Sequence, residues 1–464
     1  MKTNTIYHDN ASYSYWLNKN WYYHSLIARL YRFFIPEDSR VLLVNCKNGF
    51  LLNAVRPCHG VGVDEDVLAT RQARQLYPQF EFHAGSVKNV PVTQPFDYIL
   101  VNSGTMEADD VQELFAQLVP HCSDHTKIII DFYSALWEPI LWLAQKCSLR
   151  RQTPLKNWLS YQDVANFIYL AGFEVVTHER AILLPVYIPL ISWLVNTYLA
   201  PLPFINWFCL SQWIVARPAL KKNIKDYAVS VIVPCRNERG NIQSIVDRTP
   251  LLGNYTEFIF VEGHSQDRTL EEIKRVQQEN KHKNISYYVQ TGKGKGDAVR
   301  LGFSKAQGDI LMILDADVTV PPEELPKFYE ALVTKADFIN GSRLVYGMES
   351  EAMRFLNLIA NYCFGIGFSW LLGQPIKDTL CGTKVLFKSD YEKIVKNRAY
   401  FGEFDPFGDF DLLFGAAKLH LKILDMPVHY KNRQYGTSQI SRFRHGFLLL
   451  CMSCIALKKF KFKS

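Results

Sequence analysis

The chain has 464 residues, of which 48% are hydrophobic, 14% aromatic and 21% charged, a composition that excludes disordered, collagen-like and low-complexity chains. At roughly 150 residues per domain, the length predicts two or three domains. The net charge of +7 is too weak to indicate a nucleic-acid partner and suits lipid headgroups or nucleotide phosphates better. Ten scattered cysteines and a start without an apolar core predict a reducing, cytoplasmic location.

The first half of the chain alternates short apolar runs with amphipathic segments. It opens with an aromatic-rich stretch at residues 14–35 that predicts a helix. Six later runs predict strands: 41–44, 61–64, 96–102, 127–133, 173–184 and 209–217. Strands that alternate with helical segments indicate a parallel sheet covered by helices. We therefore expect a first α/β domain over residues 1–217.

Residues 185–208 form the most apolar window of the chain and lie between the last two of these strands. The window is broken by four prolines: Pro185, Pro189, Pro201 and Pro203. A membrane-spanning helix needs about 20 uninterrupted residues, so a single span is rejected. Two interpretations stay open. The insert forms short helices that act as a lid or enter a membrane interface, or it is a buried helical hairpin packed on its own domain.

A polar stretch at residues 218–228 predicts a linker to a second domain. Four further apolar runs predict the strands of that domain: 229–235, 258–263, 285–290 and 309–318. Together they predict a second α/β domain over residues 229–464. Its end, from residue 444, combines roughly a dozen apolar residues with flanking lysines and arginines. This tail predicts a basic amphipathic helix beside anionic lipid.

The strongest chemical signal is a pair of aspartates, Asp315 and Asp317, at the end of the run 309–318. Residues i and i+2 of an extended strand share a face, so both carboxylates are expected to point into one site. Oxygen ligands at that spacing suit Mg²⁺ or Mn²⁺ bridging a diphosphate. The alternative is a pair of acidic residues that only cap the next helix.

Three other segments place polar residues after predicted strands, and the two lysines among them lie between glycines ahead of a helix, as in a phosphate cradle. Beside Pro234, these polar residues are Arg236, Asn237, Glu238, Glu262, Lys293, Lys295 and Asp297. In this order the segments resemble the start of a family 2 glycosyltransferase, whose GT-A fold binds nucleotide sugars. The polyprenyl-phosphate (dolichyl-phosphate) mannosyltransferase and glucosyltransferase branch is the most similar part of that family. The resemblance covers about residues 228–455.

The resemblance implies a role for each matching residue. The donor base and ribose would be held by Pro234, Arg236, Asn237, Glu238 and Glu262. The nucleotide and the phosphates would be bound by Lys293, Lys295, Asp297, Asp378, Arg433, Gly436 and Ser438. The catalytic group would be Asp315, Asp317, Arg343, Lys384 and Asp411, with Asp409 as an alternative to Asp411. Asp378, Gly382 and Lys384 match one element of the family, in which Lys384 replaces the commoner arginine and loses its bidentate geometry.

Enzymes of this kind transfer a sugar from a nucleoside diphosphate sugar by one in-line displacement with inversion. If the acceptor is a polyprenyl phosphate, its anionic oxygen needs no general base, and Arg343, Lys384 and Arg433 would position the two phosphates. If the acceptor is a glycan hydroxyl, Asp411 or Asp409 would be the base. Both acceptors stay open, and a lipid acceptor implies a protein that is peripheral at a membrane surface.

Residues 15–217 resemble a class I S-adenosylmethionine methyltransferase with a Rossmann-like fold. In that family an acidic residue and a glycine-rich turn after the first strand admit the cofactor. Here Leu43 stands at the acidic position and Asn45 and Lys47 replace two glycines, so only Gly49 remains. Asp64 keeps the position that binds the ribose hydroxyls. This pattern argues against normal binding of S-adenosylmethionine.

Three functional interpretations follow from the two resemblances. The first is a metal-dependent glycosyltransferase with a retired methyltransferase-like scaffold, whose apolar insert contacts a membrane or a partner. The second is a bifunctional enzyme that also methylates a sugar or lipid through a modified pocket. The third is a membrane scaffold without catalytic activity.

Overall fold

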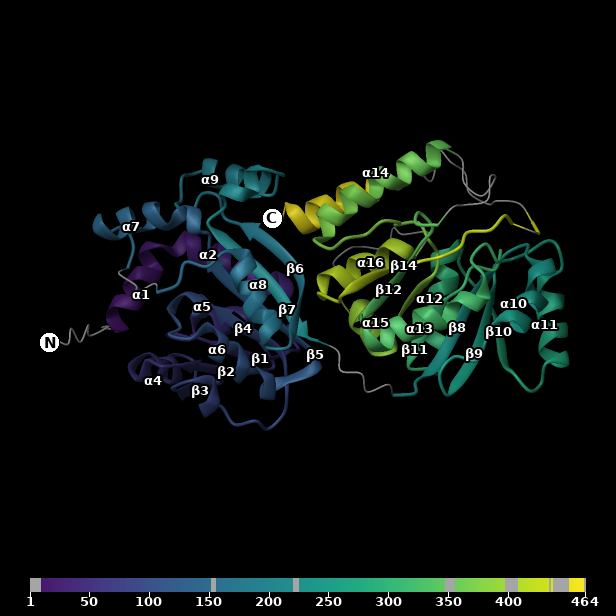
Figure 1. Cartoon of the computed structure of the whole chain (residues 1–464), viewed down its shortest axis with the longest axis horizontal. Helices are drawn as coiled ribbons and strands as arrows, with labels where there is room; N and C mark the ends of the chain where they lie inside the picture. The colour runs from purple at the N-terminus through teal and green to yellow at the C-terminus, as the bar shows by residue number, and fades with distance from the viewer. Residues whose placement is uncertain are drawn as a thin grey trace. The chain divides into compact units, whose positions relative to one another are not determined.

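The computed structural model describes residues 10–151, 156–219, 225–346, 355–396, 408–433, 435–436 and 450–462. The chain forms two compact units, residues 1–219 and 220–463, and each contains a seven-stranded sheet with packed helices (Figure 1). The prediction of two α/β folds is confirmed.

The sheet of the first unit is doubly wound. Its strands are β1 (Arg40–Val44), β2 (His59–Asp64), β3 (Glu81–Ala84), β4 (Phe96–Asn102), β5 (Cys122–Tyr133), β6 (Phe173–Ala181) and β7 (Ser211–Pro218). Their order is β3-β2-β1-β4-β5-β7-β6, and β7 runs antiparallel to both of its neighbours. The chain reverses direction across the sheet between β1 and β4, and ligands of such sheets bind outside the carboxyl ends at that switch point.

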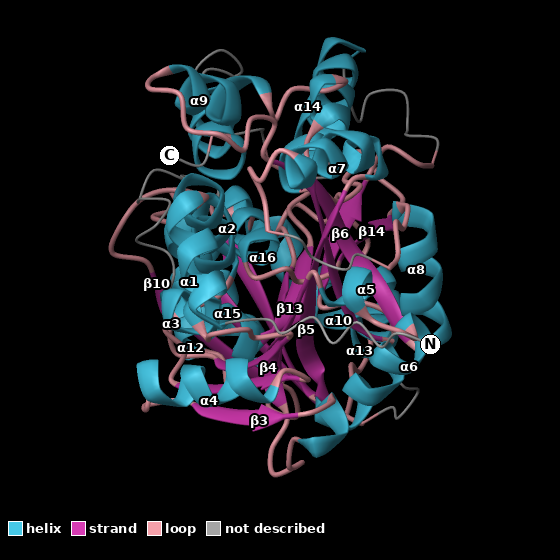
Figure 2. Cartoon of the chain, turned by 90° about the vertical axis from the view of Figure 1, so that its left-hand side faces the viewer, coloured by secondary structure: helices cyan, strands magenta, loops and turns pink. Residues whose placement is uncertain are grey.

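The core of the first unit is built on its central strands. Val41, Leu42 and Leu43 of β1 are fully buried, as expected of a parallel strand that is covered on both faces. The helices are α1 (Asn10–Lys19), α2 (Trp21–Phe34), α3 (Phe50–Val55), α4 (Val67–Leu76), α5 (Gly104–Glu107), α6 (Val111–Leu118), α7 (Glu138–Lys146), α8 (Tyr161–Leu170) and α9 (Ile191–Leu194). The aromatic opening is therefore two helices rather than one, and the insert holds short helices as predicted (Figure 2).

The second unit has a mixed sheet. Its strands are β8 (Ala228–Cys235), β9 (Tyr255–Glu262), β10 (Asn284–Val289), β11 (Ile310–Ile313), β12 (Phe338–Ser342), β13 (Lys384–Phe387) and β14 (Ile423–Pro427). They follow the order β10-β9-β8-β11-β13-β12-β14, with β8 to β11 parallel and β13 antiparallel to both neighbours. The switch point lies between β8 and β11.

Helices pack around this sheet, and the last turns of the chain pack on them. The helices are α10 (Ile242–Arg248), α11 (Thr269–Glu279), α12 (Lys295–Lys305), α13 (Leu325–Thr334), α14 (Phe355–Leu372), α15 (Lys388–Lys396) and α16 (Asp409–Lys418). In the C-terminal helix, Met452, Ala456 and Phe460 are buried at a spacing of four residues, and Phe460 contacts Phe414 of α16. Within the described ranges, we find no helix with the length and apolarity required to cross a bilayer.

Candidate active site

The candidate active site of the second unit starts where β8 ends, at Asn237 and Glu238. Asn237 has a φ angle of 57° and ties this turn to the loop after β9. Its N–H donates to Ser265 Oγ (2.9 Å), and its Oδ1 accepts from the Gln266 N–H (2.8 Å). The Glu238 carboxylate accepts a hydrogen bond from Asn241 Nδ2 (2.7 Å). These bonds fix the direction of the Glu238 carboxylate.

The other predicted donor-binding residues lie along the same carboxyl edge, but not all of them face open space. Glu262 ends β9, is buried, and accepts a hydrogen bond from the Ser265 N–H (2.5 Å), so its carboxylate shapes the following loop. Asp297, in the first turn of α12, accepts from the Gly292 N–H (3.1 Å) and closes the glycine-containing turn. Pro234 is half-buried in β8, and Arg236 and Lys293 are exposed.

Asp315 lies beyond the end of β11 and pairs with Lys295 at the start of α12, with 2.6 Å between Asp315 Oδ1 and Lys295 Nζ. Burial raises the pKa of Asp315, but the charges of Lys295, Lys384 and Arg343 outweigh it and lower that pKa overall. A Cβ added at Gly382 would lie 2.0 Å from Asp315 Oδ2 and 2.2 Å from Lys295 Nζ. The ion pair therefore needs a glycine at position 382.

Asp317 belongs to a second ion-pair group, which crosses the switch point between β8 and β11. Arg433 donates from Nη2 to Asp317 Oδ2 (2.7 Å) and from Nη1 to Glu238 Oε1 (2.9 Å). Thr319 Oγ1 donates to Asp317 Oδ1 (2.8 Å). Burial and the charge of Asp317 raise the pKa of Glu238 to about 7, although Arg433 opposes the shift. Two carboxylates thus share one arginine at this edge.

The geometry of the two aspartates differs from the prediction. The expectation of an extended strand to residue 318 is wrong, because β11 ends at Ile313 and a turn with Val318 at a φ of 56° follows. Asp315 and Asp317 therefore do not share a strand face. Each faces a different cation, and the site consists of two neighbouring ion-pair groups.

Arg343 and Asp378 form a buried bidentate pair. Arg343 Nε and Nη2 donate to the two oxygens of Asp378 at 2.7 and 2.9 Å, and the Arg343 guanidinium lies over the Tyr430 ring at 5.2 Å. Lys384 is fully buried, and its Nζ donates to Asn340 Oδ1 (3.1 Å) and Cys381 O (2.6 Å). This burial differs from the expectation that Lys384 touches phosphate, and the charge of Lys384 helps to lower the pKa of Asp315.

The start of α16 approaches the start of α12 closely, since a Cβ on Gly408 would lie 2.8 Å from Gly296 Cα. This contact brings the buried Asp411 of α16 toward the edge that holds Lys295. The side chain of Asp409 and the whole of Ser438 lie outside the described residues. Gly436, with a φ of 77°, would place a Cβ 3.1 Å from Asn237 O, so the segment that carries Arg433 lies against the turn after β8.

Asp315 and Asp317 are the residues that would hold a divalent metal ion, in exchange for their present partners Lys295 and Arg433. Asp315 and Asp317 supply the carboxylate oxygens that Mg²⁺ and Mn²⁺ prefer, and the lowered pKa of Asp315 keeps its carboxylate ionised. Among the residues whose placement is described, no group of three or more His, Cys, Asp or Glu side chains could hold a metal ion. Such an ion would therefore take further ligands from a bound diphosphate or water.

Several further residues complete this site that no sequence pattern had singled out. Thr319 orients Asp317, Tyr430 lies beneath Arg343, and the Tyr435 hydroxyl donates to Asp267 Oδ2 (3.2 Å). Thr319 could have been found, because a threonine two residues after an aspartate commonly bonds to it in a turn. The tyrosines carry no such local signal, since their partners are distant in sequence.

In the first unit, the equivalent crevice between β1 and β4 is bridged by the unit's own side chains. Lys47, after β1, has a φ of 49° and reaches Glu107, after β4, with 2.8 Å between Lys47 Nζ and Glu107 Oε2. Asn45 Nδ2 donates to Asn102 O (3.0 Å) across the same gap. These are the positions where the resemblance expects glycines, and here their side chains fill the approach to the sheet edge.

The two methyltransferase positions that the sequence retains are also engaged. Asp64 is 4% exposed, and its oxygens accept from the N–H groups of Lys47 (2.8 Å) and Asp66 (3.0 Å). Gly49 keeps a positive φ of 80° and packs against Phe82, which a Cβ would approach to 2.8 Å. Both retained positions are therefore in contact with other residues of the first unit.

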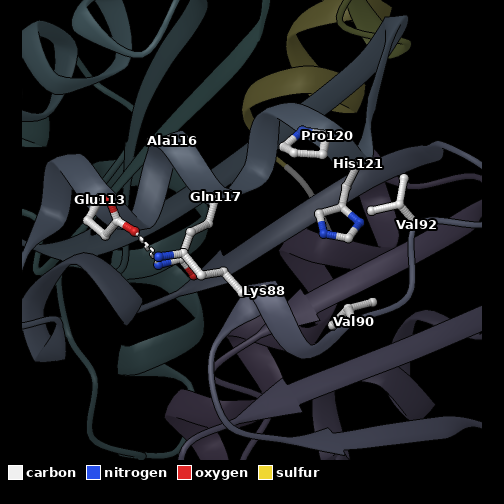
Figure 3. Close-up of a pocket in the computed structure, with 8 residues that line it drawn as sticks. All are labelled: Lys88, Val90, Val92, Glu113, Ala116, Gln117, Pro120 and His121. Atoms are coloured by element: carbon white, nitrogen blue, oxygen red, sulfur yellow. Dashed lines mark hydrogen bonds and ion pairs between the residues drawn. The ribbon is translucent and has the colours of Figure 1, made fainter.

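The first unit also has an open pocket away from this edge (Figure 3). Its lining residues are Lys88, Val90, Val92, Glu113, Ala116, Gln117, Pro120 and His121. His121 packs against Phe96, the first residue of β4, so the pocket lies at the amino end of that strand. It is therefore not the place where a doubly wound sheet binds its ligand.

Comparison with known proteins supports the resemblance of the second unit. Residues 230–400 match the family described as "Glycosyl transferase family 2". A dolichol-phosphate mannosyltransferase of Pyrococcus furiosus is 32% identical over 217 residues, which are 46% of this chain and 59% of the relative. An undecaprenyl-phosphate 4-deoxy-4-formamido-L-arabinose transferase of Salmonella paratyphi B is 26% identical over 235 residues, 47% of this chain and 63% of the relative.

The second unit therefore contains a region, residues 230–400, that is similar to glycosyltransferase family 2. The chain spans about three fifths of the length of these two relatives. Solved structures similar to parts of the chain include a putative methyltransferase in complex with Trm112 from Haloferax volcanii, at 13% identity and a TM-score of 0.34, over 44% of this chain and 92% of that one. They also include glucosyl-3-phosphoglycerate synthase of Mycobacterium tuberculosis, at 17% identity and a TM-score of 0.37, over 50% and 80%.

Proposed function

We propose that the chain is a metal-dependent inverting glycosyltransferase that moves a sugar from a nucleoside diphosphate sugar to a polyprenyl phosphate. The observation that carries this proposal is the meeting of Glu238, Asp315 and Asp317 with Lys295 and Arg433 at the carboxyl ends of β8 and β11. Open α/β sheets bind their ligands at this place. The printed names of the relatives, which include two polyprenyl-phosphate sugar transferases, support the acceptor class.

The two ion-pair groups provide what a diphosphate requires. Lys295 and Arg433 now neutralise Asp315, Asp317 and Glu238, and both cations can exchange these carboxylates for phosphate oxygens. A Mg²⁺ or Mn²⁺ ion held by Asp315 and Asp317 would neutralise charge on the departing nucleoside diphosphate. Arg433 would then bind the diphosphate from the segment that lies against the turn after β8.

The acceptor side of the site is cationic as well. The buried charges of Arg343 and Lys384 lower the pKa of Asp315 and would also attract an anionic acceptor. A polyprenyl phosphate oxygen is already nucleophilic, so no general base is required. If the acceptor is a glycan, Asp411 is the residue that would accept the hydroxyl proton. In either case the first unit serves as a scaffold, and the reaction takes place at a membrane surface when the acceptor is lipid-linked.

A donor screen tests the proposal. UDP- and GDP-sugars are supplied with Mg²⁺ or Mn²⁺, with and without a polyprenyl phosphate, and both nucleoside diphosphate release and the lipid-linked sugar are measured. We expect one donor to give release that depends on metal and acceptor. Absence of transfer with every donor and acceptor would reject the proposal, and transfer to a glycan alone would replace the acceptor.

A further inference from the structure

The first unit presents a continuous group of exposed apolar side chains, which we call the apolar cap. It is formed by residues 136–143, in and just before α7, and by the insert at 186–208. Its exposed members are Leu136, Ile140, Trp142, Leu143, Val186, Tyr187, Ile188, Leu190, Ile191, Trp193, Leu194, Tyr198, Leu199, Phe204, Trp207 and Phe208. A monomeric water-soluble protein rarely exposes an apolar patch of this extent, so the cap indicates an interaction surface.

The polarity of the insert is inverted relative to a surface helix in water. Its polar residues point inward, with Ser192 0% and Thr197 7% exposed. Its apolar residues point outward, with Leu190 68% and Phe204 72% exposed. This distribution is the opposite of the amphipathic pattern that water favours. It is the pattern expected of an element whose outer surroundings are apolar.

Hydrogen bonds hold the insert in this inverted arrangement. Asn196 Oδ1 accepts from the N–H groups of Leu183 and Leu184 (both 2.9 Å), and Asn196 Nδ2 donates to Leu184 O (2.7 Å) and the Tyr22 hydroxyl (3.2 Å). Ser192 Oγ accepts from the Ile188 N–H (2.7 Å). These bonds satisfy backbone groups of Leu183, Leu184 and Ile188 without water, as an element that faces an apolar medium requires.

The two segments of the cap are joined and lie at one end of the unit. Trp137 Nε1, just before α7, donates to Phe208 O (2.8 Å). The insert also reaches α2, where the ring centroids of Tyr187 and Trp21 are 5.0 Å apart. Figures 1 and 2 show α9 at the end of the first unit opposite α4. The cap is therefore one surface.

The charged residues around the cap indicate that it contacts an anionic surface. No charged residue occurs between Arg180 and Arg217. At the rim, Lys146 Nζ lies 4.7 Å from the centre of the Trp142 ring, and Lys19 Nζ donates to Ser148 O (2.7 Å) just after α7. Glu138 is the acidic residue of α7. Aromatic side chains with lysines at their edge are typical of elements that lie in the headgroup region of a bilayer.

We propose that the apolar cap docks the first unit on the interfacial region of an anionic lipid bilayer, without crossing it. A second copy of the chain would also cover apolar side chains. It does not account for a charge-free insert with a lysine-bearing rim, whereas lipid headgroups do. The surface lies entirely in the first unit, so the inference stands independently of the proposed glycosyl transfer.

Vesicle binding tests this inference. The full chain is mixed with phosphatidylcholine vesicles with or without phosphatidylglycerol, and bound protein is measured by flotation and by quenching of tryptophan fluorescence with brominated lipid. The triple variant Trp193→Ser, Phe204→Ser, Trp207→Ser should bind about 100-fold more weakly, because it removes inserted apolar area. The double variant Lys19→Glu, Lys146→Glu should lose about tenfold on anionic vesicles only.

The matched control is Tyr169→Ser with Leu251→Ser, two side chains outside the cap that are each 76% exposed. This control should bind vesicles as the wild type does. Unchanged binding by the triple variant would overturn the inference, and so would cap-dependent dimers in light scattering without vesicle binding. The proposed function is tested separately with a short soluble prenyl phosphate as acceptor. If vesicle binding is intact but no sugar is transferred to this acceptor, the proposed function is contradicted and the docking inference is not.

Discussion

Each unit has a crevice at the carboxyl edge of its sheet, where the strand order reverses. The two crevices differ in the residues that bridge them. In the first unit, the gap between β1 and β4 is bridged by Lys47 and Glu107, which come from the two edge loops themselves. In the second unit, the gap between β8 and β11 is bridged by Arg433, which comes from a distant segment and serves two carboxylates. An ion pair therefore spans each crevice, formed by local residues in the first unit and by a distant residue in the second.

The two units also differ in the pKa shift of an acidic residue near the end of a strand. Asp131, at the end of β5 in the first unit, has a pKa raised to about 7 by burial, which a hydrogen bond from the Tyr31 hydroxyl only partly opposes. Asp315, in the second unit, is half-buried, and neighbouring cations lower its pKa. The two pKa values shift in opposite directions, because cations lie near Asp315 whereas desolvation is the largest influence on Asp131.

The largest effect is expected for Asp317→Ala. This substitution removes a carboxylate that pairs with Arg433 and that would bind the metal ion. Release of nucleoside diphosphate should fall by about 100- to 1000-fold, as for other electrostatic groups at a reacting centre. The control is Asp247→Ala, an exposed aspartate of α10 in the same unit. Near-normal turnover of the Asp317 variant with added Mn²⁺ would contradict the assignment.

Gly382→Ala should have the next largest effect. Its Cβ would overlap Asp315 Oδ2 and Lys295 Nζ, so both side chains must shift from their present positions. We expect turnover to fall by about 10- to 100-fold while the fold is retained. Gly367→Ala is the matched control, because its Cβ would meet no atom within 4 Å. Equal activity of the two variants would show that the pair of Asp315 and Lys295 is not needed.

The sequence predicted the parts of this site that depend on local patterns. The runs that became β4 and β8 were found because they are long and apolar. The strands β12, β13 and β14 were missed, since each has five residues or fewer and depends on pairing with distant segments.

The acidic residues were also placed at the correct edge, but their partners were not predicted. Arg433 lies 116 residues from Asp317, and no local pattern records that contact. The burial of Lys384 could not be predicted either, because it depends on β13 lying between β11 and β12 in the folded sheet. A charged residue in a motif carries no local sign of whether it faces substrate or core.

A smaller effect is expected from Asp131→Asn, and it concerns stability. Because the folded pKa of about 7 exceeds the ordinary value of 3.8, the folded state binds more protons between about pH 4 and pH 7. The free energy of unfolding therefore falls as the pH rises through this window, by roughly 3 kcal/mol from this one group. The asparagine variant should lack this part of the fall.

Urea unfolding at pH 5 and pH 8, followed by tryptophan fluorescence, measures this difference. The signal reports the first unit, because all tryptophans except Trp370 lie there. Asp124→Asn changes an exposed aspartate of the same strand and serves as the control. If the wild type and the Asp131 variant lose stability equally between the two pH values, Asp131 does not retain its proton in the folded state.

For S-adenosylmethionine we expect no binding to the first unit, and therefore no change in its stability. A ligand at 100 times its Kd would stabilise the folded state by about 2.7 kcal/mol, so binding would be evident in the tryptophan-detected unfolding curve. We expect no shift, because Lys47 and Glu107 bridge the crevice and Asp64 is engaged. Asn45→Gly with Lys47→Gly removes both bridges at positions whose positive φ favours glycine. If this double variant binds S-adenosylmethionine, the side chains of Asn45 and Lys47 alone close the site. If the wild type binds it and Asp64→Ala abolishes the binding, the crevice is not closed.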